Sequence, residues 1–405
     1  MQTTRIARAA VPLVIGALAL TACGSGKEKT SGGGNKTLTI GVVAPLTGDL
    51  AAIGNGIKNG VDLAVKQANA NKTIKGVTLK MDAEDDTAKA DVGATVAAKL
   101  VADNSVVGVV GPLNSSVARS VAPVMATANL AILSPANSAT DLTGRDKLPG
   151  TQTRPNKSYF RLAATDDIQG PFAADFAVKT LHKKVVAVVH DKKAYGQGLA
   201  EAFAKQAAKD GAKVLKTETV NPGDKDFSAT IDKIKPQKPD FLFYGGEYPE
   251  ASLLTKQMKA KGLNIPLMGG DGVQSDEYIK IAGAAANGDY ATGFGAPTAS
   301  LDSAKQFLAD YKAQGYQQEA DPYGASAFDA ANAIIKALAK ALGEDANKSG
   351  QALRDEVTKE VGDTDFDGVT GHISFDQFGD TNNKVLTAYV IKDGKYEASN
   401  TSSFK

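Results

Sequence analysis

The stretch that most constrains the fold of this chain runs from Val106 to Thr143. It contains two short apolar runs, Val106–Val110 and Ala131–Leu133, and each leads through a Gly-, Pro- and Ser-rich turn into a helical pattern. Successive strand–turn–helix units of this kind predict neighbouring parallel strands in an α/β sheet. The carboxyl ends of such strands present backbone N–H groups to one edge of the sheet, where an anion binds readily.

Hydroxyl side chains lie in both of these turns. Ser115 and Ser116 occupy the first turn, and Ser134 and Ser138 occupy the second. Ser115 or Ser138 taken alone is equally well interpreted as a helix N-cap. Because adjacent parallel strands bring both turns to one edge, the pair favours a site for one carboxylate. We interpret this edge as half of a ligand site and expect the other half in a second lobe.

The alternation of apolar strands and amphipathic helices recurs along most of the chain. It begins with a strand at Thr37–Ala44, is interrupted by a connection at Asn156–Asp166, and restarts over Gly170–Gly269. A chain of 405 residues also exceeds the usual size of one core. We therefore predict an α/β protein with two doubly wound, Rossmann-like lobes. Near the C-terminus, two strands are expected at Gly371–Gly379 and Lys384–Val390, around the short polar turn between them.

The N-terminal segment has the pattern of an export signal. Arg5 and Arg8 precede an apolar run at Ala9–Leu20, which is too short to be a good membrane span. The run ends in Leu-Thr-Ala-Cys, which resembles a bacterial lipoprotein cleavage box, and Cys23 is the only cysteine of the chain. We predict a signal peptide over residues 1–22, lipidation of Cys23, and a flexible Gly/Ser/Lys linker over residues 23–36.

The residues give little support for catalysis or for nucleotide binding. The three histidines, at positions 182, 190 and 372, are scattered, and the chain contains no Gly-x-Ser-x-Gly elbow and no Walker loop. The glycines of Gly54–Gly60 have the wrong spacing for a dinucleotide turn and fall within a helical pattern. A net charge of +1 gives no support for nucleic-acid binding. We predict no catalytic residues, no cofactor and no nucleic-acid partner.

Two acidic segments are the remaining candidates for a metal site. The first, Asp82–Asp86, follows an expected strand at Val77–Met81 and is interpreted as a solvated turn. The second, Asp363–Gly368, begins like a calcium loop but has Ser374 where the bidentate Glu belongs. We therefore favour an acidic turn before a strand in the second segment and predict no metal.

Two turns of the second half complete the residue-based candidates. Tyr195 and Asp271 follow apolar runs there, as the serines do in the first half. An aromatic side chain and an acid at such positions can cover a ligand and pair with its ammonium group. Ordinary turn chemistry explains them equally well.

Six segments, taken in order, resemble the branched-chain amino acid–binding proteins of ABC importers. They are Ile40–Gly48, Val106–Thr143, Val188–Leu199, Phe243–Glu250, Leu267–Gly272 and Gly371–Gly379. The resemblance implies the type I periplasmic binding protein fold, in which three crossover strands join two lobes that close on a ligand like a Venus flytrap. It implies one lobe over residues 37–164 and 297–368, and the other over residues 165–296 and 369–405.

The resemblance also implies a set of ligand-binding residues. The set is Ile53, Leu113, Ser115, Ala136, Ser138, Tyr195, Glu247, Asp271 and Tyr323. The two serines, with the backbone of Leu113 and Ala136, would hold the α-carboxylate of an amino acid.

The other members of this set would contact the rest of the ligand. Asp271 would meet the α-ammonium group, in place of a glutamate in relatives, and Tyr195 and Tyr323 would line the side-chain pocket. Ile53 and Glu247 replace aromatic residues of relatives. A second acid at Glu247 favours an additional positive or hydrogen-bonding group on the ligand.

The function implied by the resemblance is capture of a ligand without catalysis. The chain is expected to bind a branched-chain or related amino acid outside the cytoplasm, as a monomer attached to the membrane through Cys23. The closed form would then dock on an ABC permease whose ATPase drives import. The alternative is a sensory or regulatory module for an amino acid, an amide or an amine-like ligand.

Overall fold

The computed structural model describes residues 35–320 and 322–404, in which the strands form two main sheets. The first sheet has five parallel strands in the order β2-β1-β3-β4-β5. These strands are β1 (Lys36–Ala44), β2 (Val77–Asp85), β3 (Val106–Val110), β4 (Ile132–Ser134) and β5 (Tyr159–Arg161). β3 and β4 are direct neighbours, so the two serine-bearing turns leave the sheet side by side.

The second sheet has eight strands, in the order β15-β14-β11-β10-β9-β6-β7, with β8 also paired to β6. The strands are β6 (Val185–His190), β7 (Lys213–Val214), β8 (Glu218–Thr219), β9 (Phe241–Gly245), β10 (Leu267–Gly269), β11 (Tyr290–Phe294), β14 (Val385–Lys392) and β15 (Lys395–Ser403). The strands β6 to β11 pair in parallel, whereas β14 and β15 are antiparallel.

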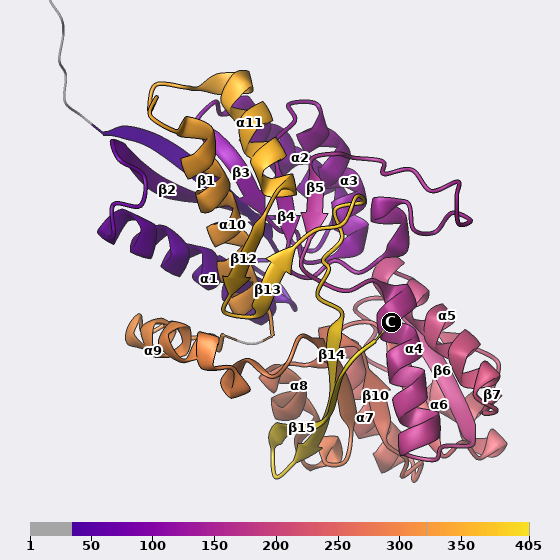
Figure 1. Cartoon of the computed structure of the whole chain (residues 1–405). Coiled ribbons are helices and arrows are strands. Elements are labelled where there is room, and N and C mark those ends of the chain that lie inside the picture. The colour runs from indigo at the N-terminus through magenta and orange to yellow at the C-terminus, as the bar shows by residue number, and fades with distance from the viewer. Residues whose placement is uncertain (1–34, 321, 405) are drawn as a thin grey trace, which may run out of the picture. The chain divides into compact units, whose positions relative to one another are not determined.

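Helices cover both faces of the first sheet. One core joins alternate residues of β1 and β3 to apolar residues of α1 (Ala51–Ala70), α10 (Gly324–Leu342) and α11 (Gly350–Gly362). The other face packs against α2 (Ala90–Ala102) and α3 (Ser115–Ala126). Figure 1 shows α10 and α11, in orange, on this sheet although they are distant from it in sequence.

The second sheet is covered in the same way. Its first face packs against α4 (Asp166–Asp175), which continues as a π-helical turn over Phe176–Thr180, and against α5 (Ala194–Lys209). Its second face packs against α6 (Ser228–Ile234), α7 (Tyr248–Ala260) and α8 (Asp276–Ala282). A further helix, α9 (Lys305–Ala313), and short 3₁₀ turns at 140–143, 235–237, 271–273, 283–286, 298–300 and 302–304 complete the described elements.

The chain passes between the two sheets three times. It leaves the first sheet after β5, returns after β11 to form α10 and α11, and crosses again after the hairpin β12 (Asp365–Gly368) and β13 (Gly371–Ser374) to form β14. The sequence-based prediction of two α/β lobes with parallel sheets is therefore confirmed.

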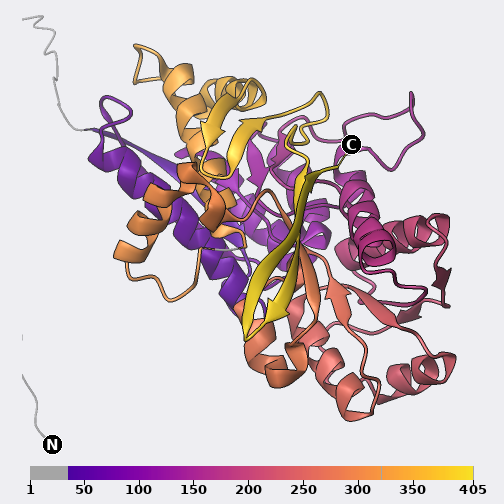
Figure 2. The same ribbon diagram turned by 60° about the horizontal axis from the view of Figure 1, so that its bottom comes forward.

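The two strands expected near the C-terminus both form, but the first ends at Ser374. They lie in different sheets, because Gly371–Ser374 pairs with β12, and Val385–Lys392 pairs with β11 and β15. The two turns of this region decide the register, because they connect residues 368 to 371 and 392 to 395. Figure 2 shows β14 and β15, in yellow, running along the second sheet.

The implied division between residues 368 and 369 falls inside the β12–β13 hairpin. The segment after the hairpin also stays with the first sheet, since Arg161 of β5 donates its backbone N–H to Gly379 at 3.0 Å. The first lobe thus extends beyond residue 368, to the segment before β14. The other boundaries of the implied division remain predictions.

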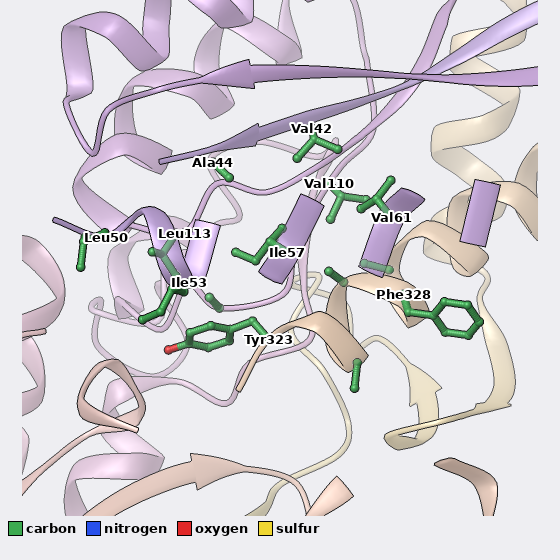
Figure 3. Packing of buried hydrophobic residues seen from close by; sticks show 14 of the residues in the cluster. Val42, Ala44, Leu50, Ile53, Ile57, Val61, Val110, Leu113, Tyr323 and Phe328 are labelled. Atoms are coloured by element: carbon green, nitrogen blue, oxygen red, sulfur yellow. The ribbon is translucent and has the colours of Figure 1, made fainter. Parts of the chain in front are cut away.

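Close helix packing positions the start of α1 beside the ligand edge. A Cβ atom on Gly54 would lie 1.9 Å from the carbonyl oxygen of Pro45, and one on Gly60 would lie 2.1 Å from that of Gly324. These glycines therefore serve packing, and the sequence correctly placed them within a helix. Figure 3 shows the resulting row of apolar side chains from Val61 and Ile57 to Ile53.

The two acidic segments have structural roles. β2 extends to Asp85, whose carboxylate accepts hydrogen bonds from the backbone N–H groups of Leu46 and Thr87 at 2.9 Å each. Asp86 is fully buried, so the expectation of a solvated turn was wrong. The second segment contributes β12, and its Asp367 contacts His372 at 2.9 Å. Within the described ranges no group of three or more His, Cys, Asp or Glu residues is arranged to hold a metal.

The predicted signal peptide (1–22), Cys23 and most of the predicted linker lie outside the described residues. None of the helices in residues 35–320 and 322–404 has the length and apolar character needed to cross a membrane.

Candidate ligand-binding site

The candidate site residues follow the carboxyl ends of strands in both lobes. Leu113 and Ser115 follow β3, and Ala136 follows β4. On the second sheet, Tyr195, Glu247 and Asp271 follow β6, β9 and β10 in the same way. This is the edge at which parallel α/β sheets bind ligands.

Ten residues from these turns and two helices line one pocket. They are Ile53, Leu113, Asn114, Ser115, Ala136, Tyr195, Glu247, Asp271, Gly272 and Tyr323. The pocket encloses a cavity of about 20 Å³, so its walls lie close together in this structure. Figure 3 shows Ile53, Leu113 and Tyr323 close together at its apolar wall.

Eight of the nine residues implied by the resemblance lie in this lining. The exception is Ser138, which is fully buried but does not line the pocket. Its carbonyl oxygen accepts the backbone N–H of Asp166 at 2.8 Å. Asp166 begins α4, and burial raises the pKa of its carboxyl to about 8.

The first half of the pocket is a helix N-terminus with a hydroxyl. Ser115 is the first residue of α3, so its backbone N–H belongs to the first turn, whose N–H groups have no partner within a helix. The Ser115 hydroxyl accepts the backbone N–H of Ala139 at 3.3 Å, which leaves its own hydrogen available for donation. Positive helix-terminal charge and a donating hydroxyl together suit a carboxylate.

A buried arginine fixes the second turn. Arg161 of β5 is fully buried, and its Nη1 donates to the carbonyl oxygen of Ala139 at 2.7 Å. Its Nε donates at 2.6 Å to Oδ1 of Asp380, in the segment that crosses to β14. Burial opposes ionisation of Asp380, but Arg161 and Arg145 outweigh it and hold the pKa of that carboxyl below its usual value. This ion pair connects the turn after β4 to the third crossing.

The second half of the pocket is centred on a buried carboxylate. Asp271 is 2% exposed, and its Oδ1 accepts the hydroxyl of Tyr195 at 2.8 Å. The hydroxyl of Tyr323, the N-cap residue of α10, donates to Oδ2. Burial raises the pKa of Asp271, although both tyrosine hydroxyls oppose the shift. The pKa of each tyrosine is raised well above its ordinary value by burial and by Asp271, so both phenols are donors.

Glu247 does not present a free charge to the pocket. Its Oε2 forms a 2.7 Å ion pair with Nζ of Lys193, and its Oε1 accepts Nδ2 of Asn114 at 2.6 Å. Burial alone would lower the pKa of Lys193, but Glu247 and Asp191 raise it above its ordinary value. The expected preference for a cationic ligand group therefore loses its basis.

Three residues of this arrangement were missed from the sequence. Asn114 and Gly272 line the pocket, and Lys193 neutralises Glu247. Asn114 stands between two residues already in the implied set, and its polarity beside Ser115 was an available signal.

Comparison with known protein families agrees with the observed fold. The family model described as "Periplasmic binding protein" matches residues 37–395. The chain belongs to this family of periplasmic binding proteins. The family assigned from the motifs is confirmed, and it is a family of extracytoplasmic binding proteins rather than of enzymes.

Individual binding proteins are similar over most of their length. The chain is 33% identical over 362 residues to the Leu/Ile/Val-binding protein BraC3 of Rhizobium johnstonii, covering 89% of this chain and 93% of that protein. The leucine-binding protein LivK of Thermotoga maritima superposes with a TM-score of 0.80 at 26% identity, covering 90% of this chain and 98% of that chain. LivJ of Streptococcus pneumoniae, solved in complex with isoleucine, gives 0.79 at 27% identity, with coverages of 91% and 99%.

Proposed function

We propose that this protein binds a branched-chain or closely related amino acid and delivers it to an ABC permease. The observation that carries the proposal is the pairing, in one pocket, of a helix N-terminus bearing Ser115 with the buried carboxylate of Asp271. One half suits an anion and the other a cation, as a zwitterionic amino acid requires. The names of the Rhizobium, Thermotoga and Streptococcus relatives support the same ligand class.

The proposed grip places the α-carboxylate at the start of α3. The Ser115 hydroxyl and the N–H groups of the first turn donate to the carboxylate, and Ala136 closes the other side. The backbone N–H of Ala136 donates to Oγ of Ser134 at 3.2 Å. This hydrogen bond stabilises the conformation of the turn that contains Ala136.

The proposed ammonium site is Asp271. Its two oxygens each accept one tyrosine hydroxyl, and a carboxylate has about four acceptor positions in all. The ammonium therefore adds further bonds and does not displace the tyrosines. A charge-assisted contact in a buried site also lowers the pKa of Asp271, against the effect of burial.

The side-chain pocket favours an aliphatic ligand. Ile53, Leu113 and the ring of Tyr323 form its apolar wall. Because Lys193 neutralises Glu247, a cationic side chain would gain no partner there to compensate for its lost hydration. Leucine, isoleucine and valine are therefore preferred over lysine, glutamine and polyamines.

Ligand capture is coupled to closure of the lobes. The ligand contacts both halves of the pocket, so it favours the closed state by its extra affinity for that state. The closed form docks on a permease, and lipidation at Cys23 keeps it at the membrane. Substitution Cys23→Ser should release the protein from the membrane fraction, and retention of the variant there would contradict the anchor.

The proposal is tested by thermal unfolding and calorimetry of the purified protein with a panel of ligands. Leucine, isoleucine and valine at a hundred times Kd should each add about 2.7 kcal/mol to the free energy of unfolding. Lysine, glutamine and putrescine should leave the midpoint unchanged. A rise with putrescine or lysine, and none with the three aliphatic amino acids, would reject the assignment.

A further inference from the structure

Two hydrogen bonds join the N-terminus of α7, in the second lobe, to the first lobe. Glu247 is the N-cap residue of this helix, and Tyr248 is its first residue. Oε1 of Glu247 accepts Nδ2 of Asn114, which follows β3, at 2.6 Å. The hydroxyl of Tyr248 donates to the carbonyl oxygen of Asp49, which follows β1. Both bonds are made between groups of the chain itself, so contact between the lobes does not depend on the ligand alone.

Both bonds are buried. Glu247, Tyr248 and Asn114 are each 4% exposed. Little water competes for their hydrogen-bonding groups, and the charge of Glu247 strengthens the bond that it accepts. An ion pair between Lys225 and Asp49 also joins the lobes, at 3.3 Å, but its side chains are 62% and 66% exposed. An ion pair in water contributes little, so the two buried bonds of α7 dominate this contact.

The second lobe orients Glu247 before the lobes meet. Nζ of Lys193, the N-cap residue of α5, holds Oε2 of Glu247 at 2.7 Å. The carboxylate therefore needs no reorganisation to present Oε1 to Asn114. Tyr248 differs from Glu247 in one respect, because it does not line the ligand pocket. Its hydroxyl therefore acts on the contact between the lobes without touching the ligand.

We propose that Glu247 and Tyr248 form a clasp between the lobes, which stabilises the closed state and determines how long the ligand is retained. This inference rests on the proposed function, which supplies the ligand whose release is slowed. A ligand that favours the closed state gains affinity from any contact that stabilises this state. The clasp therefore raises the affinity for every such ligand by the same factor. Because opening must break both bonds, the clasp slows dissociation more than it changes association.

Replacement Tyr248→Phe tests the clasp, because it removes the hydroxyl and keeps the ring. Stopped-flow release of leucine from the purified protein should accelerate about fivefold, as the loss of one hydrogen bond predicts. The association rate should stay within about twofold of the wild type. Isoleucine and valine should show the same acceleration, because the bond acts on the lobes and not on the ligand. An unchanged release rate, or an acceleration confined to one amino acid, would overturn the inference.

The matched control is Tyr316→Phe. The hydroxyl of Tyr316, between α9 and α10, donates to Oδ2 of Asp62 in α1, so this bond lies within the first lobe. Leucine release from this variant should match the wild type, as should release from Lys225→Ala, which removes only the exposed ion pair. If Tyr316→Phe accelerated release as much as Tyr248→Phe, the loss of any tyrosine hydroxyl would explain the effect and the clasp would be rejected.

The arrangement of the lobes without ligand separates failure of the clasp from failure of the proposed function. Absence of binding by leucine, isoleucine and valine alike would reject the proposed function. The clasp would still predict a larger radius of gyration for Tyr248→Phe than for the wild type in X-ray scattering without ligand, because fewer molecules of the variant are closed. Equal radii would then overturn the clasp.

Discussion

Asp271 is the residue on which the proposed binding of the amino-acid ligand depends most. It joins the two halves of the molecule directly, because Tyr323 belongs to α10 of the first lobe and Asp271 follows β10 of the second. Gly270 is required beside it, since a Cβ there would lie 2.3 Å from the hydroxyl of Tyr195. The carboxylate of Asp271 and the phenols of Tyr195 and Tyr323 form one hydrogen-bonded cluster.

Replacement Asp271→Asn should abolish amino-acid binding while the chain stays folded. The amide keeps the shape of the side chain but removes the charge that meets the ammonium group, and a buried charge loses most when its partner is removed. We expect the Kd for leucine to rise by at least a hundredfold, measured by calorimetry. The unfolding midpoint without ligand serves as the control for folding, and affinity within threefold of the wild type would contradict the assigned role.

The sequence indicated which residues occupy the turns of the pocket, but not every partner that these residues have in the folded chain. Ser115 was found because two adjacent strands carry their turns to the same edge, whereas Ala136 came from the family resemblance. Glu247 was also found, but its meaning was not, because its partners Lys193 and Asn114 lie 54 and 133 residues away. The sequence shows that residue 247 is acidic, but the pairing of its charge depends on tertiary contacts.

At the scale of elements, α1 contains two glycines, Gly56 and Gly60, that differ in how much space surrounds them. A Cβ on Gly60 would lie 2.1 Å from the carbonyl oxygen of Gly324 in α10. A Cβ on Gly56, one turn earlier, would meet its nearest atom at 3.6 Å, an ordinary contact distance.

The two glycines should therefore respond oppositely to alanine. Gly60→Ala should destabilise the protein by about 2 kcal/mol or more, because backbone of α10 must move to admit the methyl group. Gly56→Ala should be neutral or stabilise by up to about 1 kcal/mol, since alanine is the better helix former. Urea unfolding of both variants measures the difference, and equal effects would contradict the close approach of α1 and α10.

Strands were predicted correctly from the sequence where their side chains are buried. β3 matches its expected range residue for residue, and β1 begins only one residue before its expected start. Their residues are almost all buried, so apolar runs indicated them clearly. β15 was missed because it is mostly exposed and polar, and backbone pairing with β14 holds it in place. Hydrophobic patterns do not detect a strand whose side chains are in solvent.

At the scale of the whole molecule, buried carboxyl groups make stability depend on pH. Burial raises the pKa of Asp166 to about 8 and that of Asp86 to about 7, and burial together with Glu247 raises that of Asp191 to about 8. The folded state therefore holds more protons than the unfolded state between about pH 4 and pH 8. These groups lower the stability as the pH rises through this window, and they outnumber His190, whose lowered pKa acts in the opposite direction.

The free energy of unfolding without ligand should be lower at pH 8 than at pH 5.5. One such group contributes a slope of about 1.4 kcal/mol per pH unit between its unfolded and folded pKa values. Asp380, whose pKa is lowered, loses its contribution only on further acidification and does not affect this window. Urea unfolding at the two pH values tests this, and Asp166→Asn should flatten the profile. Equal or greater stability at pH 8 would contradict the effect.

The three crossings between the sheets also determine when the protein can finish folding during synthesis. The core of the first lobe needs Ile334 and Leu338 of α10, which the ribosome adds only after the whole of β6 to β11. The core of the second lobe needs Leu386 and Ala388 of β14, close to the C-terminus. The core of the first lobe is therefore incomplete until α10 and α11 have been made, and that of the second lobe until β14 has been made.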